Sequence, residues 1–184
     1  MSEKTNLQYQ TEAANVRKIF INKNKDYGNS WKIMRIPSLI DQIYIKADRI
    51  RNIEDGTIPQ VEDDLATEYI GIINYCIITL IQQEIKKQGT DIQTFDELLT
   101  RYDFYLREAH ELMKKKNHDY GEAWRNMYIT SFTDLILARI LRIRQILVNQ
   151  GKTLVSEGLE ANLYDMINYA FFALIKLKEK NENR

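Results

Sequence analysis

Apolar residues recur at spacings of three and four along almost the whole chain. That period is typical of amphipathic helices, whereas the strict alternation that marks a half-buried strand is negligible here. Only two prolines and seven glycines interrupt the pattern. The sequence therefore predicts an all-α protein.

One phrase occurs twice, as KNKDYGNSW at residues 23–31 and as KNHDYGEAW at residues 116–124. When residues 24–53 are aligned without gaps on residues 117–146, roughly half of the positions are identical, which indicates an internal duplication. Each copy alone would bury little of its long apolar helices. We therefore expect the two copies to fuse into one helical domain with a pseudo-twofold axis.

Each repeat is predicted to contain three helices. Their approximate bounds are residues 8–25, 38–56 and 62–87 in repeat one, and residues 95–117, 131–151 and 157–180 in repeat two. Gly28 and Gly121 follow the first helix of each repeat and supply the left-handed backbone that ends a helix. The predicted organisation is repeat one over residues 1–87, a linker over residues 88–94 and repeat two over residues 95–184.

The charged residues are balanced, with 26 Lys and Arg against 26 Asp and Glu. A net charge of zero argues against a broad basic surface for nucleic acid or for an anionic membrane. The first residues lack the apolar core of a signal peptide, and no stretch approaches the length of a membrane span. We therefore expect a cytoplasmic protein without a membrane partner. The single cysteine, Cys76, excludes an intrachain disulfide and a cysteine-ligated zinc site.

The second helix of each repeat carries an acidic residue three positions after a serine, Asp41 after Ser38 and Asp134 after Ser131. A serine at the start of a helix accepts from backbone N–H groups, and an acid three residues later completes a capping-box-like exchange. This pattern favours structural capping over a metal site.

The same helices carry paired cations, Lys46 with Arg49 and Arg139 with Arg142. A spacing of three residues places both cations on one side of a helix, where they can hold phosphate oxygens. The alternative is that these long side chains flank the apolar face or form ion pairs within the domain.

The third helix of repeat two places Asp165 and Asn168 within an otherwise apolar stretch. A carboxylate in such surroundings is costly unless it is paired, protonated or bound to a cation. Glu157 and Glu160 precede it, so the three carboxylates could hold a hard divalent cation. Repeat one has Gly71 at the position of Asp165, so its acidic site is predicted to be degenerate. The alternative for the polar residues is a buried network that fixes helix register.

The doubled phrase ends a helix with an acid, Asp26 or Asp119, at the negative end of the helix dipole. One explanation is a local Asx turn. Another is a pocket in which the neighbouring Tyr and Trp rings contact a flat ligand such as a nucleobase. On the pocket hypothesis Trp124→Leu should weaken binding, whereas Trp31→Leu should act mainly on stability. The alternative is that the phrase serves only to stop a helix and to pack the core.

The combination of KNHDYGEAW, DLILARILRIRQI and EANLYDMINYA resembles the family called nucleotide modification associated domain 1. Repeat two matches the closing family motif E-D-x-L-x-D-x-x-N-Y at Glu160, Leu163, Asp165, Asn168 and Tyr169. It departs from that motif at Ala161, and repeat one lacks the acid at Gly71. The resemblance implies a role around nucleotide or base modification.

The chain is also remotely similar to the all-helical nucleoside triphosphate pyrophosphohydrolases of the MazG and dimeric dUTPase type. Those enzymes hold magnesium with helix carboxylates, and their units assemble in pairs. Their E-E-x-x-E motif is absent here, so the likeness concerns architecture and chemistry and not membership. It raises magnesium-dependent nucleotide pyrophosphohydrolase activity and a homo-oligomer as expectations.

The leading hypothesis is a nucleotide-binding helical protein that hydrolyses or edits a nucleoside phosphate with magnesium. Glu157, Glu160 and Asp165 are predicted to hold the metal. The residues predicted to bind the substrate are Asp119, Tyr120, Trp124, Arg139, Arg142 and Asn168 in repeat two, and Asp26, Tyr27, Lys46 and Arg49 in repeat one. The alternative is a non-catalytic binding or adaptor protein whose polar core sets helix register.

Overall fold

The computed structural model describes residues 2–59, 64–152 and 157–182. These residues form six α-helices and two short 3-10 helices, and they contain no strand, so the predicted all-α class is confirmed. The elements are α1 (Glu3–Tyr27), η1 (Ser30–Ile33), α2 (Ile36–Glu54), α3 (Leu65–Gln88), α4 (Phe95–Tyr120), η2 (Ala123–Asn126), α5 (Ile129–Val148) and α6 (Leu159–Glu182).

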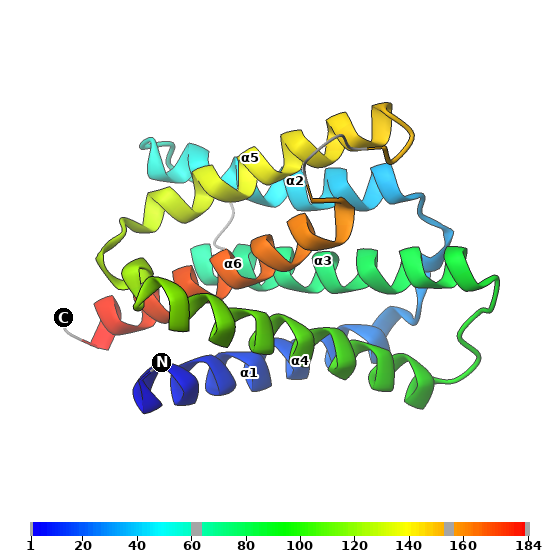
Figure 1. The fold of residues 1–184 in the computed structure, drawn as a ribbon, viewed down its shortest axis with the longest axis horizontal. Coiled ribbons are helices and arrows are strands. Elements are labelled where there is room, and N and C mark those ends of the chain that lie inside the picture. Colours follow the sequence, from blue (N-terminus) through cyan, green and yellow to red (C-terminus); the bar gives the residue numbers. More distant parts are fainter. Residues whose placement is uncertain (1, 60–63, 153–156, 183–184) are drawn as a thin grey trace.

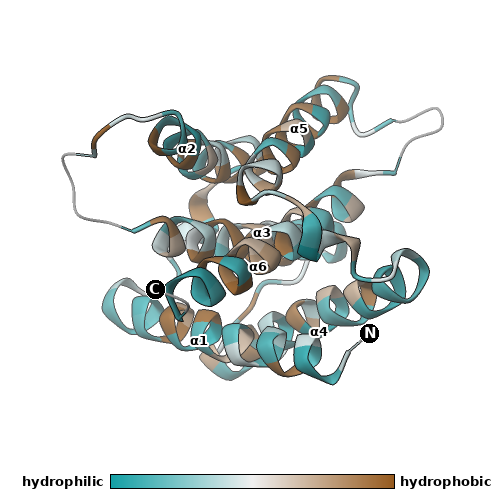
Figure 2. Cartoon of the chain, turned by 90° about the vertical axis from the view of Figure 1, so that its left-hand side faces the viewer, coloured by the Kyte–Doolittle hydropathy of each residue, from teal (hydrophilic) through white to brown (hydrophobic). Residues whose placement is uncertain are grey.

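The helices lie in three layers of two (Figures 1 and 2). One outer layer holds α2 and α5, the other holds α1 and α4, and α3 and α6 lie between them. The central helices carry long runs of buried apolar residues because they are covered by both outer layers. Contrary to the expectation from the sequence, one helix, α3, is long and apolar enough to cross a membrane, but most of it is buried here, and a core helix has the same properties.

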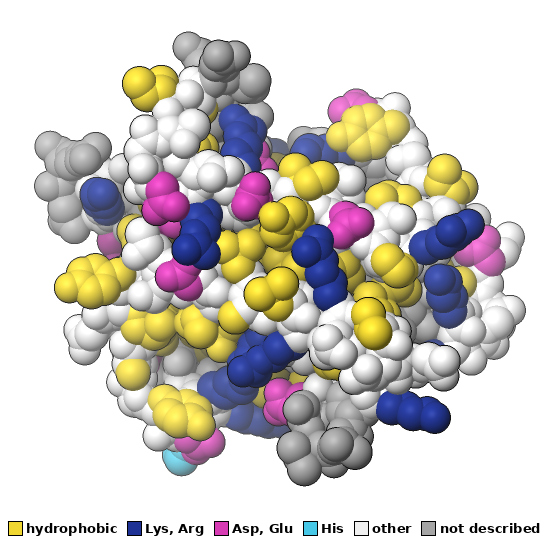
Figure 3. Space-filling view, turned by 90° about the horizontal axis from the view of Figure 1, so that it is seen from above, with side chains coloured by type: hydrophobic (Ala, Val, Ile, Leu, Met, Phe, Trp, Pro, Cys, Tyr) yellow, Lys and Arg dark blue, Asp and Glu magenta, His cyan; other side chains and the backbone are white. Residues whose placement is uncertain are grey.

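The outer face of α2 and α5 mixes apolar and charged side chains (Figure 3). Ile45 in α2 and Leu141 in α5 are 57% and 64% exposed. Lys, Arg, Asp and Glu side chains are interspersed with apolar ones on this face (Figure 3).

Equivalent contacts on the two sides of the molecule reveal the pseudo-twofold relationship. The Tyr102 hydroxyl in α4 donates to Asn74 Oδ1 in α3 at 2.7 Å. The Tyr9 hydroxyl in α1 donates to Asn168 Oδ1 in α6 at 2.8 Å. In each case the first helix of one repeat binds the third helix of the other. The predicted arrangement of two fused three-helix repeats is therefore confirmed.

The second helices are joined by a reciprocal pair of salt bridges. Arg144 in α5 lies 2.9 Å from Asp41 in α2, and Arg51 in α2 lies 3.5 Å from Asp134 in α5. Because both pairs are largely exposed, each contributes little to the free energy of unfolding, about 0–1 kcal/mol. The two pairs show that equivalent residues of the two repeats face each other across the pseudo-twofold axis.

The predicted capping role of Asp41 and Asp134 is wrong. α2 begins at Ile36 and α5 at Ile129, and their N-cap residues, Arg35 and Tyr128, make no side-chain capping bond. The serines therefore lie inside the first turn of each helix and not before it. Pro37 in the first turn of α2 suits this earlier start because its missing N–H would have no partner there.

Other helix ends lie close to their predicted positions. α3 ends at Gln88 and α4 begins at Phe95, so the predicted linker over residues 88–94 corresponds to the connection between them. α1 begins at Glu3, earlier than predicted, because Ser2 caps it by accepting from the Thr5 N–H. In repeat one, the predicted start of the third helix at residue 62 lies outside the described residues. In repeat two, the third helix is α6, which begins at Leu159 and not at the predicted residue 157.

In both copies the doubled phrase ends a helix at a glycine with positive φ, although the backbone of the two turns differs. Gly28 follows α1 and Gly121 follows α4, both at φ of +61°, which favours glycine. Gly121 is in the left-handed helical conformation with ψ of 38°, whereas Gly28 has ψ of −150°. A short 3-10 helix follows each glycine and buries its tryptophan, Trp31 at 7% and Trp124 at 4% exposure. The predicted helix stop is confirmed, and the phrase also supplies a core residue.

In each repeat, a side chain of the third helix donates hydrogen bonds to backbone carbonyl oxygens of the segment that follows the glycine. Gln82 in α3 donates from Nε2 to the carbonyl oxygens of Lys32, at 3.0 Å, and of Met34, at 3.2 Å. Lys176 in α6 donates to the equivalent oxygens of Arg125 and Met127. The same pair of carbonyl groups is therefore bound in both repeats, by an amide in repeat one and by an ammonium group in repeat two.

Candidate functional site

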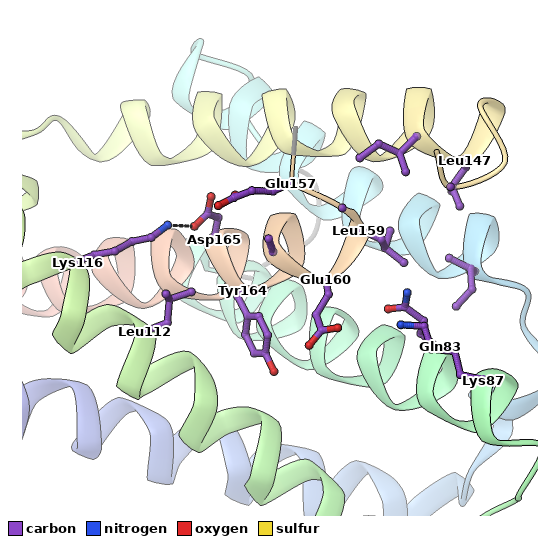
Figure 4. Close-up of a pocket in the computed structure, with 15 residues that line it drawn as sticks. Gln83, Lys87, Leu112, Lys116, Leu147, Glu157, Leu159, Glu160, Tyr164 and Asp165 are labelled. Atoms are coloured by element: carbon purple, nitrogen blue, oxygen red, sulfur yellow. Dashed lines mark hydrogen bonds and ion pairs between the residues drawn. The ribbon is translucent and has the colours of Figure 1, made fainter. Parts of the chain in front are cut away.

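A cavity of about 790 Å³ lies in repeat two, between the start of α6, the end of α5, α4 and the last turns of α3 (Figure 4). Its aliphatic wall includes Leu112, Ile146, Leu147 and Leu159. Its polar lining residues are Gln83 and Lys87 from α3, Lys116 from α4, Glu157, and Glu160, Tyr164 and Asp165 from α6. Both repeats therefore contribute to it, although most of the lining belongs to repeat two.

A buried ion cluster occupies one end of this cavity. Asp165 has only 4% of its side chain exposed, and Lys116 Nζ binds its Oδ1 (Figure 4). Arg139 Nη2 lies 2.7 Å from Asp165 Oδ2. The two cations come from α4 and α5, so three helices meet at one carboxylate. Pairing is therefore how this buried carboxylate is stabilised, as one of the predicted alternatives requires.

The environment of Arg139 keeps its guanidinium charged. Burial alone would lower the pKa of Arg139, but the hydrogen bond to Tyr169 and the negative charges of Asp165 and Glu157 outweigh burial and raise it. Arg139 has only 18% of its side chain exposed. Its charge is therefore committed to the carboxylate of Asp165, and Arg139 does not line the cavity.

The three carboxylates predicted as metal ligands do not converge on one point. Glu157 extends toward Asp165, whereas Glu160 points toward the side on which Tyr164 lies (Figure 4). In the described ranges, no group of three or more His, Cys, Asp and Glu side chains could hold a metal ion. Asp165 also already contacts two cations, which would repel a third. Magnesium therefore stays a prediction from the sequence.

The residues of the doubled phrase after Lys116 do not line this cavity. Trp124 is stacked on Phe172, with ring centroids 4.4 Å apart and planes inclined by 7°. Arg125 lies over the Trp124 ring at 4.4 Å. Core packing thus accounts for Trp124. Asp119 and Tyr120 are exposed at the end of α4, and their contact with a ligand stays a prediction.

Two further predicted residues also lie away from the cavity. Asn168 is buried, accepts from Tyr9 and donates from Nδ2 to the Ala109 carbonyl at 3.0 Å. It belongs to the polar network that joins the repeats, which agrees with the register alternative. Arg142 is exposed on α5 and forms no ion pair with any described residue.

Repeat one has a buried acid, although not at the position that aligns with Asp165. Glu68 in α3 has 6% of its side chain exposed and lies 2.6 Å from Arg49 and 3.4 Å from Lys46. The predicted loss of the acidic partner at Gly71 is therefore offset three residues before it, one turn back along the same helix. Lys46 and Tyr27 line a second, smaller pocket, whereas Asp26 is exposed and does not.

Lys87 and Lys116 are not among the residues predicted from the sequence. Lys116 is the first residue of KNHDYGEAW and lies four residues before Tyr120, so the repeat itself is the signal that points to it. Lys87 is one of two adjacent lysines in the last turn of α3, which the sequence alone does not distinguish. Only the packing of α3 beside α6 places Lys87 at the cavity.

Comparison with known families accounts for the doubled pattern. The family model described as nucleotide modification associated domain 1 matches residues 23–83 and residues 116–177, more than half of the chain. The two matched segments begin at Lys23 and Lys116, and the second contains the whole ion cluster. No curated protein and no solved structure matches the chain significantly.

Proposed function

Because the chain belongs to the nucleotide modification associated domain 1 family, which links it to nucleotide modification, we propose that the cavity of repeat two binds a nucleoside phosphate. The observation that carries this proposal is the position of the cavity. It lies against the cluster of Lys116, Arg139 and Asp165, and all three residues fall within the second family match.

The size and lining of the cavity support a ligand of this class. Pockets for small molecules usually measure about 300–1,000 Å³ and combine apolar walls with a few polar groups. This cavity has about 790 Å³, an aliphatic wall and charged groups at both ends. A nucleobase and its sugar would bury apolar surface against Leu112 and Leu147, and Glu157 and Gln83 would exchange hydrogen bonds with them.

The phosphate is assigned to Lys87. Lys87 is exposed and forms no ion pair with any described residue, so its charge is available to a phosphate. Lys116, at the other end of the cavity, is already bound to Asp165 (Figure 4). Hydrolysis of the bound phosphate with magnesium is the sequence-based hypothesis for the reaction, and the binding proposal does not depend on it.

The test is an equilibrium titration of the full chain with canonical and base-modified deoxynucleoside mono- and triphosphates. Each titration is run with and without magnesium or manganese, and chromatography of the mixtures shows whether a product forms. Lys87→Met should weaken the affinity of the tightest ligand at least tenfold. Lys86→Met is the matched control, since Lys86 is its exposed neighbour in α3 and does not line the cavity.

The proposal is wrong if no nucleotide of the panel binds the parent protein. It is equally wrong if the Lys87 and Lys86 variants bind with the same affinity as the parent. Loss of affinity in both variants would indicate general attraction to the basic end of α3 and would also contradict a site in the cavity.

A further inference from the structure

Repeat one contains a smaller pocket of about 150 Å³ where the end of α1, η1, α2 and α3 meet. Two lysines line it, Lys23 from α1 and Lys46 from α2. Aromatic side chains surround the lysines, among them Tyr27 and Tyr75. The three α-helices are the repeat-one equivalents of α4, α5 and α6, which hold the ion cluster in repeat two.

Of the two lysines of this pocket, only Lys46 has a carboxylate partner among the described residues. Glu68 is shared between Arg49, at 2.6 Å, and Lys46, at the longer distance of 3.4 Å. Lys23 is exposed and forms no ion pair within the described part of the chain. In repeat two, the equivalent cations Lys116 and Arg139 both contact the carboxylate of Asp165.

The difference between the repeats is concentrated at Gly71, which stands where repeat two has Asp165. A Cβ placed on Gly71 would lie 2.6 Å from both Cδ and Cε of Lys46. The Lys46 side chain therefore lies across α3 at a position that an acidic side chain would otherwise take. Repeat two places a carboxylate between its two cations, whereas in repeat one Lys46 keeps only its pair with Glu68 at 3.4 Å and Lys23 has no described carboxylate partner, and both lysines line the pocket.

Neutral hydrogen-bond donors also line the pocket. Asn74 is 7% exposed, and its Oδ1 accepts from Tyr102, but its Nδ2 donates to no described residue. Tyr75 keeps its proton, because burial, and then the nearby Tyr27, raise the pKa of its hydroxyl. The pocket thus offers an amide N–H and a hydroxyl in addition to the two ammonium groups.

We propose that the repeat-one pocket binds a phosphate group between Lys23 and Lys46, where repeat two has the carboxylate of Asp165. Ammonium groups, an amide N–H and a hydroxyl match the several acceptor oxygens of a phosphate. The volume of about 150 Å³ admits a phosphate but not a whole nucleotide. The remainder of a larger ligand would lie outside, beside Tyr27, which is 60% exposed.

This site is independent of the nucleotide cavity. The two share no lining residue, and neither Lys23 nor Lys46 contributes to the cavity of repeat two. A variant of one site therefore tests that site alone.

Calorimetric titration of the full chain with inorganic phosphate, at constant ionic strength, tests the proposal. Gly71→Asp places a carboxylate where repeat two has one, and it should weaken phosphate binding at least tenfold. Lys23→Met should weaken it at least fivefold and is the second variant, because Lys23 is exposed and its loss leaves the core intact. Lys25→Met, on the same helix but outside the pocket, is the matched control and should bind as the parent does.

Two further probes distinguish the source of the phosphate. Ribose 5-phosphate and deoxyadenosine monophosphate are titrated in the Lys87→Met background, where the other cavity contributes little. Equal affinities for all probes support recognition of the phosphate group alone, and tighter binding of the nucleotide supports a nucleotide with its base outside the pocket. The proposal is overturned if the parent binds none of the probes, if acetate binds as tightly as phosphate, or if Gly71→Asp and Lys23→Met bind like the parent.

Discussion

The side chain of Lys46 lies across α3 at Gly71, and Cδ and Cε of Lys46 would each lie 2.6 Å from a Cβ at that position. In repeat two the equivalent pair is Arg139 and Asp165, which attract each other across 2.7 Å. Both positions of the pair therefore differ between the repeats. In repeat two the pair consists of a cation, Arg139, and an anion, Asp165. In repeat one the cation Lys46 lies against Gly71, which has no side chain. The same helical framework therefore presents two different electrostatic sites.

Removing the charge of Asp165 should destabilise the fold. Asp165→Asn keeps the shape of the side chain but leaves Arg139 buried without its counterion, so we expect a loss of about 3 kcal/mol in the free energy of unfolding. Urea unfolding of the parent and the variant measures the difference. Asp41→Asn is the control, because Asp41 belongs to an exposed pair and its change should cost less than about 1 kcal/mol. Equal losses in both variants would contradict a special role for the buried cluster.

Trp124 is expected to act on stability and not on nucleotide binding. Phe172 covers one side of its ring system and Arg125 lies over the ring, so Trp124→Leu removes buried contacts and should cost about 3 kcal/mol. Thermal or urea unfolding checks this loss, and a nucleotide titration of the folded variant should match the parent within about twofold. A clear loss of nucleotide affinity with unchanged stability would restore the pocket hypothesis for the doubled phrase.

The two tyrosines that join the repeats should behave alike. Tyr9→Phe and Tyr102→Phe keep their ring contacts, with Phe171 and with Phe20, but remove the hydroxyl that donates to a buried asparagine. Each variant should lose about 1–3 kcal/mol, the cost of an unsatisfied buried acceptor. Unfolding curves for both variants provide the measurement. A loss in one variant only would show that the pseudo-symmetry of the contacts does not extend to their energies.

Glu122 should make the fold sensitive to acid. Burial would raise its pKa, but hydrogen bonds from the Ser2 N–H and from Thr5 and Arg125 outweigh burial and lower the pKa from 4.5 to about 2. A lowered folded-state pKa stabilises the protein above pH 4.5, and this contribution is lost as the pH falls toward 2. Unfolding of the parent and of Glu122→Gln across this range should show a stability gap that narrows with acid. A gap that stays constant would contradict the assignment.

The parts of the fold that depend on local sequence could be predicted. The helical period, the duplication and the helix ends at Gly28 and Gly121 all follow from neighbouring residues. The starts of α2 and α5 could not be predicted from Ser38 and Ser131. A favourable N-cap contributes only about 1 kcal/mol, and tertiary packing that prefers an earlier start can exceed that.

The candidate site was only partly predictable for a related reason. The apolar surroundings of Asp165 show that it needs a partner, but Lys116 and Arg139 come from two other helices, whose facing sides are set by tertiary packing. Glu68 illustrates the same limit. It lies one helical turn before the position that aligns with Asp165, so it still reaches the equivalent cations, but an alignment of the two repeats does not reveal it. Lys87 reaches the cavity only through the packing of the two central helices.

The central claim is that the cavity of repeat two holds a nucleoside phosphate, and a crystal structure of the full chain grown with the tightest-binding deoxynucleotide tests it most directly. The predicted result is a ligand inside the cavity, with its phosphate within hydrogen-bonding distance of Lys87 Nζ and its base or sugar against Leu112 and Leu147. A nucleotide bound elsewhere, such as on the exposed ring of Tyr120, with the cavity empty and Lys87 uncontacted, would contradict the claim.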